Sequence, residues 1–433
     1  MTRTMKDSGV EWIGEIPEGW TLLRGKFLFR QRNEKGNSID LQLLSPTQNY
    51  GVIPQSEYEK LSGMKAVKLA EDADLSEFKS IYKGDFCISL RSFQGGFEYS
   101  RYDGVVSPAY QVFLATTEKT ENDFFRYLFK DKSFIEKMTS FTRTFRDGKS
   151  IAYSDFANSL IPVPPLNEQH AIAAYLDTRC AKIDAIIAQT RDTIDEYKKL
   201  KQSIITEAVT KGIRPGRTMK DSGIEWIGEM PEEWTVIKIK WLLNERNERS
   251  LNGSEEPLSM SQKFGLIPTK EMDIVPNMAS SFIGAKLCFQ GDLVFNKLKA
   301  HLGVFAVSRY DGLVSPDYAV YISTGRANLK FLEYLFKTPQ CINEFRKRST
   351  GVGAGLTRLY TSSLYSICCA LPAYEEQNAI VKFIDDRCAQ IDALIVQKEQ
   401  LIAELETYKK SLIYEYVTGK KEVPVSYADH RND

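Results

Sequence analysis

The segment MKDSGVEWIGEIPEGW at residues 5–20 is repeated as MKDSGIEWIGEMPEEW at residues 219–234, and the two agree at 13 of 16 positions. Three further pairs of matching segments follow in the same order: SRYDGVVSPAY at 100–110 with SRYDGLVSPDY at 308–318, EQHAI at 168–172 with EQNAI at 376–380, and SIITEAVT at 203–210 with SLIYEYVT at 411–418. Four colinear matches do not arise by chance, so the sequence indicates a duplicated unit of roughly 210 residues.

The two copies have diverged most between these matches. Residues 21–163 and 235–371 agree only at scattered positions, such as the Gly-Asp pairs at 84–85 and 291–292. Both segments have the length of a typical domain, and both mix strand-like runs with amphipathic helical runs. We therefore predict two α+β domains. A protein with two equivalent supports and two different recognition surfaces would show this pattern, and so would ordinary drift of loops around a retained core.

A long heptad pattern follows each domain. Prolines end the preceding segments, because proline cannot donate a ladder hydrogen bond, and Asn167 is the expected N-cap of the first helix. Apolar residues then recur at a and d positions over about 45 residues in each copy, as a coiled coil requires. A helix of this length extends about 67 Å. Cys180 and Cys388 fall on the apolar seam, where we expect core residues rather than ligands or nucleophiles.

Two observations favour antiparallel pairing of these helices. A parallel pair in register would place Lys201 opposite Lys409 in one core layer, which is unfavourable. It would also require residues 213–234 to return along the whole helix, although this segment reaches at most about 73 Å when fully extended. Antiparallel pairing needs only a local linker at residues 212–216.

The predicted fold class is therefore α+β, with two α+β domains joined by two long helices in an antiparallel coiled coil and an internal pseudo-two-fold duplication. The predicted segments are an N-terminal arm (1–20), a first domain (21–165), a central coiled-coil helix (166–212), a linker with the repeated arm (213–234), a second domain (235–373), a C-terminal coiled-coil helix (374–421) and a tail (422–433).

The composition is that of a soluble globular protein without an overall basic excess. Lys+Arg and Asp+Glu both number 57 in 433 residues, so any nucleic-acid surface must be a local patch. The seven cysteines form no CxxC pair, and three histidines do not complete a conventional zinc set. The sequence has no apolar signal segment and no run of about 18 apolar residues. We therefore expect a cytoplasmic protein without a membrane partner.

Two basic segments lie just ahead of the prolines that end the domains. Each carries a net charge of +3, although the net charge of the chain is zero. Arg and Lys bind phosphates, and Arg can also read guanine bidentately. The equivalent placement of the two segments favours DNA binding over solvated basic loops. The candidate DNA-binding residues are Lys137, Arg143, Arg146 and Lys149 in the first copy, and Arg346, Lys347, Arg348 and Arg358 in the second.

A second candidate surface follows the Gly-Asp turn of each copy. Polar and basic side chains gather there in both copies, although the residue types differ. The candidates are Arg91, Ser92 and Gln94, beside Phe93, in the first copy, and Lys297 and Lys299, between Asn296 and His301, in the second.

Motifs for covalent or redox chemistry are missing from the sequence. The glycine-rich residues 351–355 lack a preceding strand and a following helix of the dinucleotide-binding type, and GxxxxGK[ST] does not occur. His170 is replaced by Asn378 in the second copy, which argues against a catalytic histidine. We predict no catalytic residue, no cofactor site and no metal site in this chain.

The repeated segments resemble those of Type I restriction–modification specificity subunits. The resemblance rests on the DSG[VI]EWIGE[IM]P-x-x-W arm, the Gly-Asp turn followed by SRYDG-[VL]-VSP, the P-x-x-EQ-x-AI helix start and the helix that ends in VT. It covers essentially the whole chain. It implies two target recognition domains, each reading one half of an asymmetric bipartite site in double-stranded DNA, with the coiled coil setting the unread spacer.

The resemblance also implies protein partners. Two modification (methyltransferase) subunits would bind along the helices, and restriction subunits could join them. S-adenosylmethionine, adenine N6 methylation, ATP, Mg and DNA cleavage would then belong to these partners, and the present chain would be non-catalytic.

Two alternatives stay open at the level of sequence. The chain could serve a system that methylates DNA without cutting it. It could also be a coiled-coil scaffold for protein partners that does not read DNA, which its neutral charge would suit. Binding to duplex DNA that falls steeply with added salt would exclude the scaffold.

Overall fold

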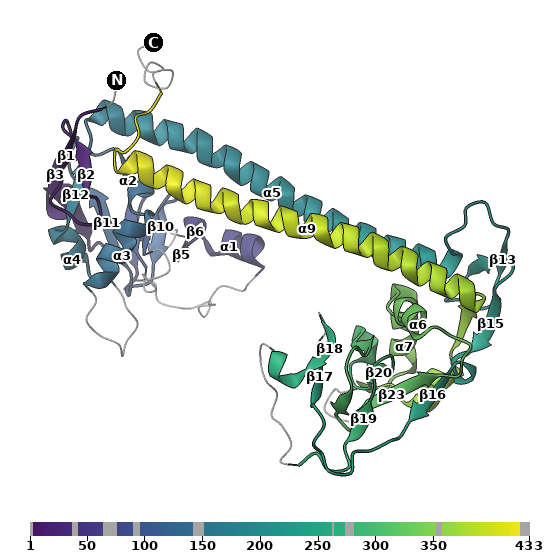
Figure 1. The fold of residues 1–433 in the computed structure, drawn as a ribbon. Coiled ribbons are helices and arrows are strands. Elements are labelled where there is room, and N and C mark those ends of the chain that lie inside the picture. Colours follow the sequence, from purple (N-terminus) through teal and green to yellow (C-terminus); the bar gives the residue numbers. More distant parts are fainter. Residues whose placement is uncertain are drawn as a thin grey trace. The chain divides into compact units, whose positions relative to one another are not determined.

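The computed structural model describes residues 3–36, 42–63, 76–89, 96–141, 151–261, 264–272, 281–351 and 357–424. The chain folds into two compact units, one made of Met1–Thr190 with Gln400–Asp433 and the other of Arg191–Glu399. Each unit contains an arm, an α+β domain and about half of each long helix (Figure 1). The predicted fold class is confirmed.

The first unit is built around a four-stranded antiparallel sheet in the order β4-β11-β8-β9. Four two-stranded pairs accompany it: β1-β2 in the arm, and β3-β12, β5-β6 and β7-β10 in the domain. The strands are β1 (Met5–Asp7), β2 (Glu15–Pro17), β3 (Thr21–Arg24), β4 (Phe29–Arg32), β5 (Leu44–Thr47), β6 (Gly51–Pro54), β7 (Lys79–Ile81), β8 (Phe86–Ile88), β9 (Phe97–Tyr99), β10 (Gly104–Val106), β11 (Gln111–Ala115) and β12 (Leu160–Val163). The shorter helices are α1 (Gln55–Ser62), α2 (Asn122–Leu128), α3 (Lys132–Ser140) and α4 (Tyr153–Asn158).

The second unit repeats this plan with the sheet order β16-β23-β20-β21. Its strands are β13 (Met219–Asp221), β14 (Glu229–Pro231), β15 (Thr235–Lys238), β16 (Leu243–Arg246), β17 (Leu258–Ser261), β18 (Gly265–Pro268), β19 (Lys286–Cys288), β20 (Leu293–Asn296), β21 (Phe305–Val307), β22 (Gly312–Val314), β23 (Tyr318–Ser323), β24 (Thr350–Gly351), β25 (Thr357–Arg358) and β26 (Cys368–Leu371). Its shorter helices are α6 (Leu329–Phe336), α7 (Pro339–Arg348) and α8 (Thr361–Ser366), with a 3-10 turn at Ala300–Leu302.

Both faces of each four-stranded sheet are buried. Successive side chains of a strand point to opposite faces, and in the first unit Phe113 joins the large aromatic core while Val112 joins a smaller apolar cluster with Leu44 and Ile81. In the second unit Phe295 stacks on Phe305 with ring centroids 4.4 Å apart. Packing on both faces leaves the strand ends and the connecting turns as the surfaces available to a ligand.

The two long helices, α5 (Leu166–Lys211) and α9 (Tyr374–Val417), run antiparallel within each unit. In the first unit Tyr175 of α5 packs on Tyr416 of α9, with ring centroids 4.7 Å apart. In the second unit Ala208 and Val209 share a core with Ile380 and Ile384. Among the described residues, no helix is both long and apolar enough to cross a membrane.

The lysines that argued against a parallel pair face aspartates. Lys409 lies 2.6 Å from Asp184, and Lys201 lies 2.6 Å from Asp392. The prediction that Asn167 caps α5 is wrong. The helix begins one residue earlier, at Leu166, because the carbonyl of Pro165 already accepts from the Gln169 amide, 3.0 Å away.

The repeated Glu-Gln pair at the start of each long helix joins the helix to its arm and its domain. In the first unit Glu168 accepts from Trp20 Nε1 of the arm at 2.9 Å. Gln169 is fully buried, donates to the Lys119 carbonyl and accepts from the Glu121 amide, both at 2.8 Å. Glu376 and Gln377 make the corresponding contacts in the second unit, to Trp234 and to the backbone of residues 326 and 328. These two residues are therefore structural.

The repeated Ser-Arg-Tyr-Asp-Gly segment is a structural turn as well. A Cβ atom on Gly104 would come within 2.4 Å of the Gln42 carbonyl oxygen, and one on Gly312 within 2.2 Å of the Glu256 carbonyl oxygen. Only glycine permits so close a backbone approach. The segment leads directly into β10 and β22, because Gly104 and Gly312 are the first residues of these strands.

Candidate nucleic-acid interface

Six of the predicted DNA-binding residues lie outside the described residues. They are Arg91, Ser92, Gln94, Arg143, Arg146 and Lys149. In the first unit Lys137 is described: it lies on α3, with its ammonium 5.1 Å from the centroid of the Phe141 ring.

In the second unit the two predicted surfaces form one surface. Lys297 and Lys299 follow strand β20, and Arg358 lies in the β24-β25 hairpin that follows α7. The backbone amide of Leu359 donates to the Lys297 carbonyl at 3.0 Å, and Thr357 Oγ1 lies 3.3 Å from His301 Nδ1. We call this combined region, residues 296–301 with 346–351, 357 and 358, the basic surface of the second unit.

The cations of the basic surface differ in what they already bind. Arg348 pairs with Glu344 at 2.8 Å, one turn back on α7. Arg358 pairs with Asp317 at 2.5 Å, in the turn between β22 and β23. The other four predicted cations of this surface form no ion pair with any described residue. They are Lys297, Lys299, Arg346 and Lys347. These four are the ones whose charge is uncompensated and available to an anionic ligand.

Lys297 is partly buried and has charged neighbours. It lies close to Lys286, whose buried ammonium donates to Glu245 at 3.1 Å and to the Tyr318 carbonyl at 3.2 Å. Burial lowers the pKa of Lys297, and the charges of Lys286 and Arg358 lower it further, with Glu245 and Asp317 opposing them. A cation that is partly dehydrated beside two other cations gains from a hydrogen-bond acceptor brought by a ligand.

Sequence reasoning missed two acidic residues at this surface. Glu245 holds Lys286 and also accepts from Thr361 Oγ1 at 2.8 Å, and Asp317 holds Arg358. A signal for Asp317 was available, because it stands where the otherwise copied first segment has Ala109. No comparable signal pointed to Glu245.

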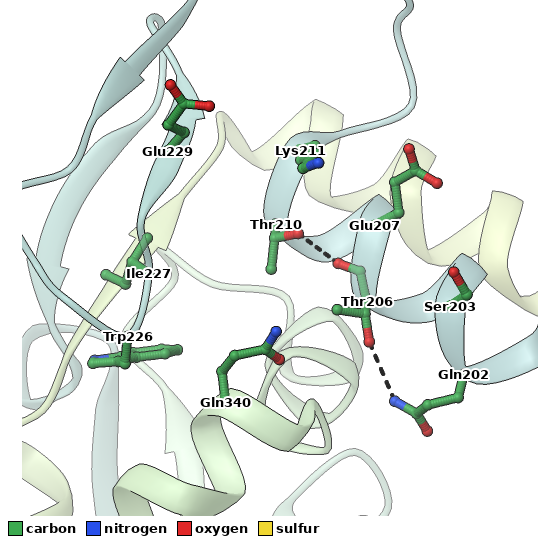
Figure 2. Close-up of a pocket in the computed structure, with 10 residues that line it drawn as sticks. All are labelled: Gln202, Ser203, Thr206, Glu207, Thr210, Lys211, Trp226, Ile227, Glu229 and Gln340. Carbon is green, nitrogen blue, oxygen red and sulfur yellow. Dashed lines mark hydrogen bonds between the residues drawn. The ribbon is translucent and has the colours of Figure 1, made fainter. Parts of the chain in front are cut away.

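A groove elsewhere on the second unit has a different chemistry (Figure 2). Its volume is about 610 Å³, and the last turns of α5, the second arm and the start of α7 line it. The figure shows Trp226 and Ile227 of the arm across from Thr206 and Thr210 of α5. Its charged lining residues are Glu207, Glu229 and a single lysine, Lys211. This balance does not suit a polyanion, so we do not assign the groove to nucleic acid.

Comparison with known proteins gives consistent similarities. Residues 25–196 match the family model described as the Type I restriction modification DNA specificity domain. The chain is 24% identical over 426 residues to the Type I restriction enzyme MjaVIII specificity subunit of Methanocaldococcus jannaschii, covering 94% of this chain and 93% of that protein. It is 22% identical to the EcoKI specificity subunit of Escherichia coli, over 60% of this chain and 57% of that protein.

Two solved structures share the fold. One belongs to a study of complex assembly and conformational transition of the type I R-M system. It matches with a TM-score of 0.70 and 17% identity, over 94% of this chain and 99% of that one. The other is the HsdS subunit from Thermoanaerobacter tengcongensis, with a TM-score of 0.55 and 18% identity, over 96% and 100% of the two chains.

Proposed function

Because this chain belongs to the family of Type I restriction–modification specificity subunits, we propose that it reads an asymmetric bipartite site in double-stranded DNA. Each of its two target recognition domains would read one half, and the coiled coil would set the spacer. One observation carries the proposal. The contacts that hold each domain to the helices are duplicated residue for residue, as at Glu168 and Glu376, whereas the candidate surfaces differ in sequence.

The domain limits are part of the proposal. We assign residues 21–165 and 235–373 to DNA recognition, and the helical residues 166–212 and 374–421 to partner docking. The arms, residues 1–20 and 213–234, would support the domains, since the Trp20 and Trp234 indoles contact the helix starts.

We propose that all the predicted residues contact DNA or support such contacts. In the second domain the structure distinguishes two groups among them. Lys297, Lys299, Arg346 and Lys347 have uncompensated charge, so we place them against the DNA. Arg348 and Arg358, held by Glu344 and Asp317, would orient the surface. In the first domain the proposed contacts are Arg91, Ser92, Gln94, Lys137, Arg143, Arg146 and Lys149.

The chain is the non-catalytic member of its complex, as its relatives are named specificity subunits. We propose that two modification subunits dock on the helices and that restriction subunits join them. The partners would supply S-adenosylmethionine, ATP and Mg. The complex would work in the cytoplasm.

A direct test is to express the chain with its modification subunit in a host that lacks adenine methylation and to map methylated adenines across the genome. We expect one bipartite motif with two different halves. A genome without any methylated motif would contradict the proposal.

The scaffold alternative has its own test in the same complex. If the chain reads DNA through its basic surfaces, the affinity for a duplex with the mapped motif falls steeply between 50 and 200 mM salt, by about a thousandfold or more if six or more phosphates are contacted. Binding that ignores both salt and sequence would favour a protein scaffold.

A further inference from the structure

We propose that Asp317 is a specificity-determining residue of the second recognition domain, and that its carboxylate accepts a hydrogen bond from the exocyclic amino group of a base, either cytosine N4 or adenine N6. The inference rests on the proposed DNA-reading function and assigns one contact within it. Asp317 was not among the residues that the sequence predicted.

Asp317 lies beside the basic surface and is held in place by contacts to it. One of its carboxylate oxygens accepts from Arg358 Nη2 at 2.5 Å, and its backbone carbonyl accepts from the Lys297 amide at 3.4 Å. The side chain is nevertheless 49% exposed. A carboxylate that is oriented by an arginine and still reaches solvent can accept a further hydrogen bond from a ligand.

A carboxylate at this place is unfavourable for contact with the DNA backbone. Phosphates are anionic and offer only acceptors, so Asp317 would repel them. A base edge in the major groove offers both donors and acceptors, and Asp or Glu is the residue that accepts from cytosine N4. Lys297 beside it can donate to an acceptor of the same or the next base pair. The mixture of Lys297, Asp317 and Arg358 therefore fits a base edge better than a phosphate.

The comparison between the two copies supports a recognition role. The segments SRYDGVVSPAY and SRYDGLVSPDY differ at two of eleven positions. One difference, Val105 against Leu313, is a buried apolar exchange. The other, Ala109 against Asp317, is not buried in either copy. The buried position keeps an apolar side chain in both copies, whereas the accessible position differs in chemistry.

The residues that contact Asp317 also differ in type between the two copies. At the corresponding sequence positions the first copy has Leu90 in place of Lys297 and Ser150 in place of Arg358. A cluster needed for folding of this domain type would be expected in both copies. Residue types that differ between the copies are what a residue set for reading one half-site requires.

The experiment uses the full chain in complex with its modification subunit. Its probes are a duplex with the mapped motif and a set of duplexes that each carry one base-pair change in the half-site of the second domain. We expect Asp317→Ala to reduce discrimination at one base pair by on the order of tenfold to a hundredfold, with discrimination at the other positions retained. Affinity for unrelated duplex should stay equal or rise, because the substitution removes a negative charge from the interface.

A second variant identifies the base. Asparagine preferentially pairs with adenine through N6 and N7. If Asp317 reads cytosine, Asp317→Asn shifts the preference at that base pair towards adenine; if it reads adenine, Asp317→Asn keeps the preference that Asp317→Ala loses. The matched control is Glu256→Ala, which removes a carboxylate paired with Lys270 on the same unit and should leave every base preference unchanged.

Two outcomes would overturn the assignment. Discrimination could persist at every base pair in Asp317→Ala, or affinity for specific and unrelated duplexes could fall together with the melting temperature, which would make Asp317 a structural partner of Arg358. If the unsubstituted chain does not bind the motif specifically, the proposed function itself is contradicted, which is a different result.

Discussion

Glu98 is a buried carboxyl group whose protonation affects the stability of the first unit. It lies on β9, is 1% exposed, and pairs with Lys130 Nζ at 2.6 Å. Burial raises the pKa of Glu98 to about 7, although the charge of Lys130 opposes the shift. In the unfolded chain a glutamate titrates near about 4.3. The folded state therefore binds the proton more tightly than the unfolded chain. The resulting contribution of Glu98 to stability is fully present below the unfolded pKa and is lost as the pH rises through about 7.

We predict that Glu98→Gln removes this pH dependence. The unsubstituted protein should lose about 2 to 3 kcal/mol more unfolding free energy than the variant when the pH is raised from 5 to 8. Urea unfolding of the two proteins at both pH values measures the difference. Glu136→Gln, at an exposed position of α3, is the control. An equal response of both variants to pH would show that Glu98 is not the group responsible.

For single residues, the sequence shows where the charges are but not which of them are neutralised within the fold. Arg348 and Arg358 count as candidate DNA contacts by composition alone. In the structure they pair with Glu344 and Asp317, and Asp317 is 41 positions away from its arginine. A partner at that separation is set by the turn between β22 and β23, which no local pattern reveals.

The long helices are the elements that the sequence predicted best. Their heptad pattern and their antiparallel sense follow from residues on one stripe, and each of Lys201 and Lys409 faces an aspartate as antiparallel pairing allows. The helix start was predicted less well. Asn167 has the side chain of a good cap, but the helix already begins at Leu166, so Pro165 and not Asn167 stands just before the helix.

We predict that the apolar seam of these helices stabilises each unit. Leu176→Ala in the first unit and Ile384→Ala in the second, both at fully buried positions, should each cost about 2 to 5 kcal/mol of unfolding free energy. Leu394→Ala, on the same helix as Ile384 but 42% exposed, should change stability by about 0.5 kcal/mol or less. Denaturant unfolding measures all three. A similar loss at Leu394 would contradict the prediction, because stability would then not depend on burial in the seam.

Over the whole molecule, the duplication explains why the general function could be predicted and the details of the site could not. The residues that determine the fold are repeated in both copies, so the architecture can be predicted from either copy. The reading surfaces are where the copies differ. In the second unit the basic surface forms only when the segment after β20 meets the hairpin after α7, a contact between residues about 60 positions apart.

We expect the two halves of the DNA site to be independent of each other. Replacing residues 137–149 by the equivalent segment of a relative with another target should change one half of the methylated motif, and replacing residues 343–358 should change only the other half. Genome-wide mapping of methylated adenines measures both. A simultaneous change of both halves would contradict the assignment of one domain to one half.

The end of α9 and the residues after it pack on the first arm. Tyr416 and Val417 belong to the same core as Trp20, and Lys420, which follows the helix, donates to the Glu15 carbonyl at 2.6 Å. This has a consequence for synthesis on the ribosome. The second unit is continuous in sequence, from Arg191 to Glu399, whereas the first needs residues after Gln400 to complete its core. During translation the domain made second can therefore finish folding first, and the domain made first must wait for the last helical turns to emerge. A nascent chain released early would present an unfinished apolar core, which makes it a substrate for chaperones and proteases.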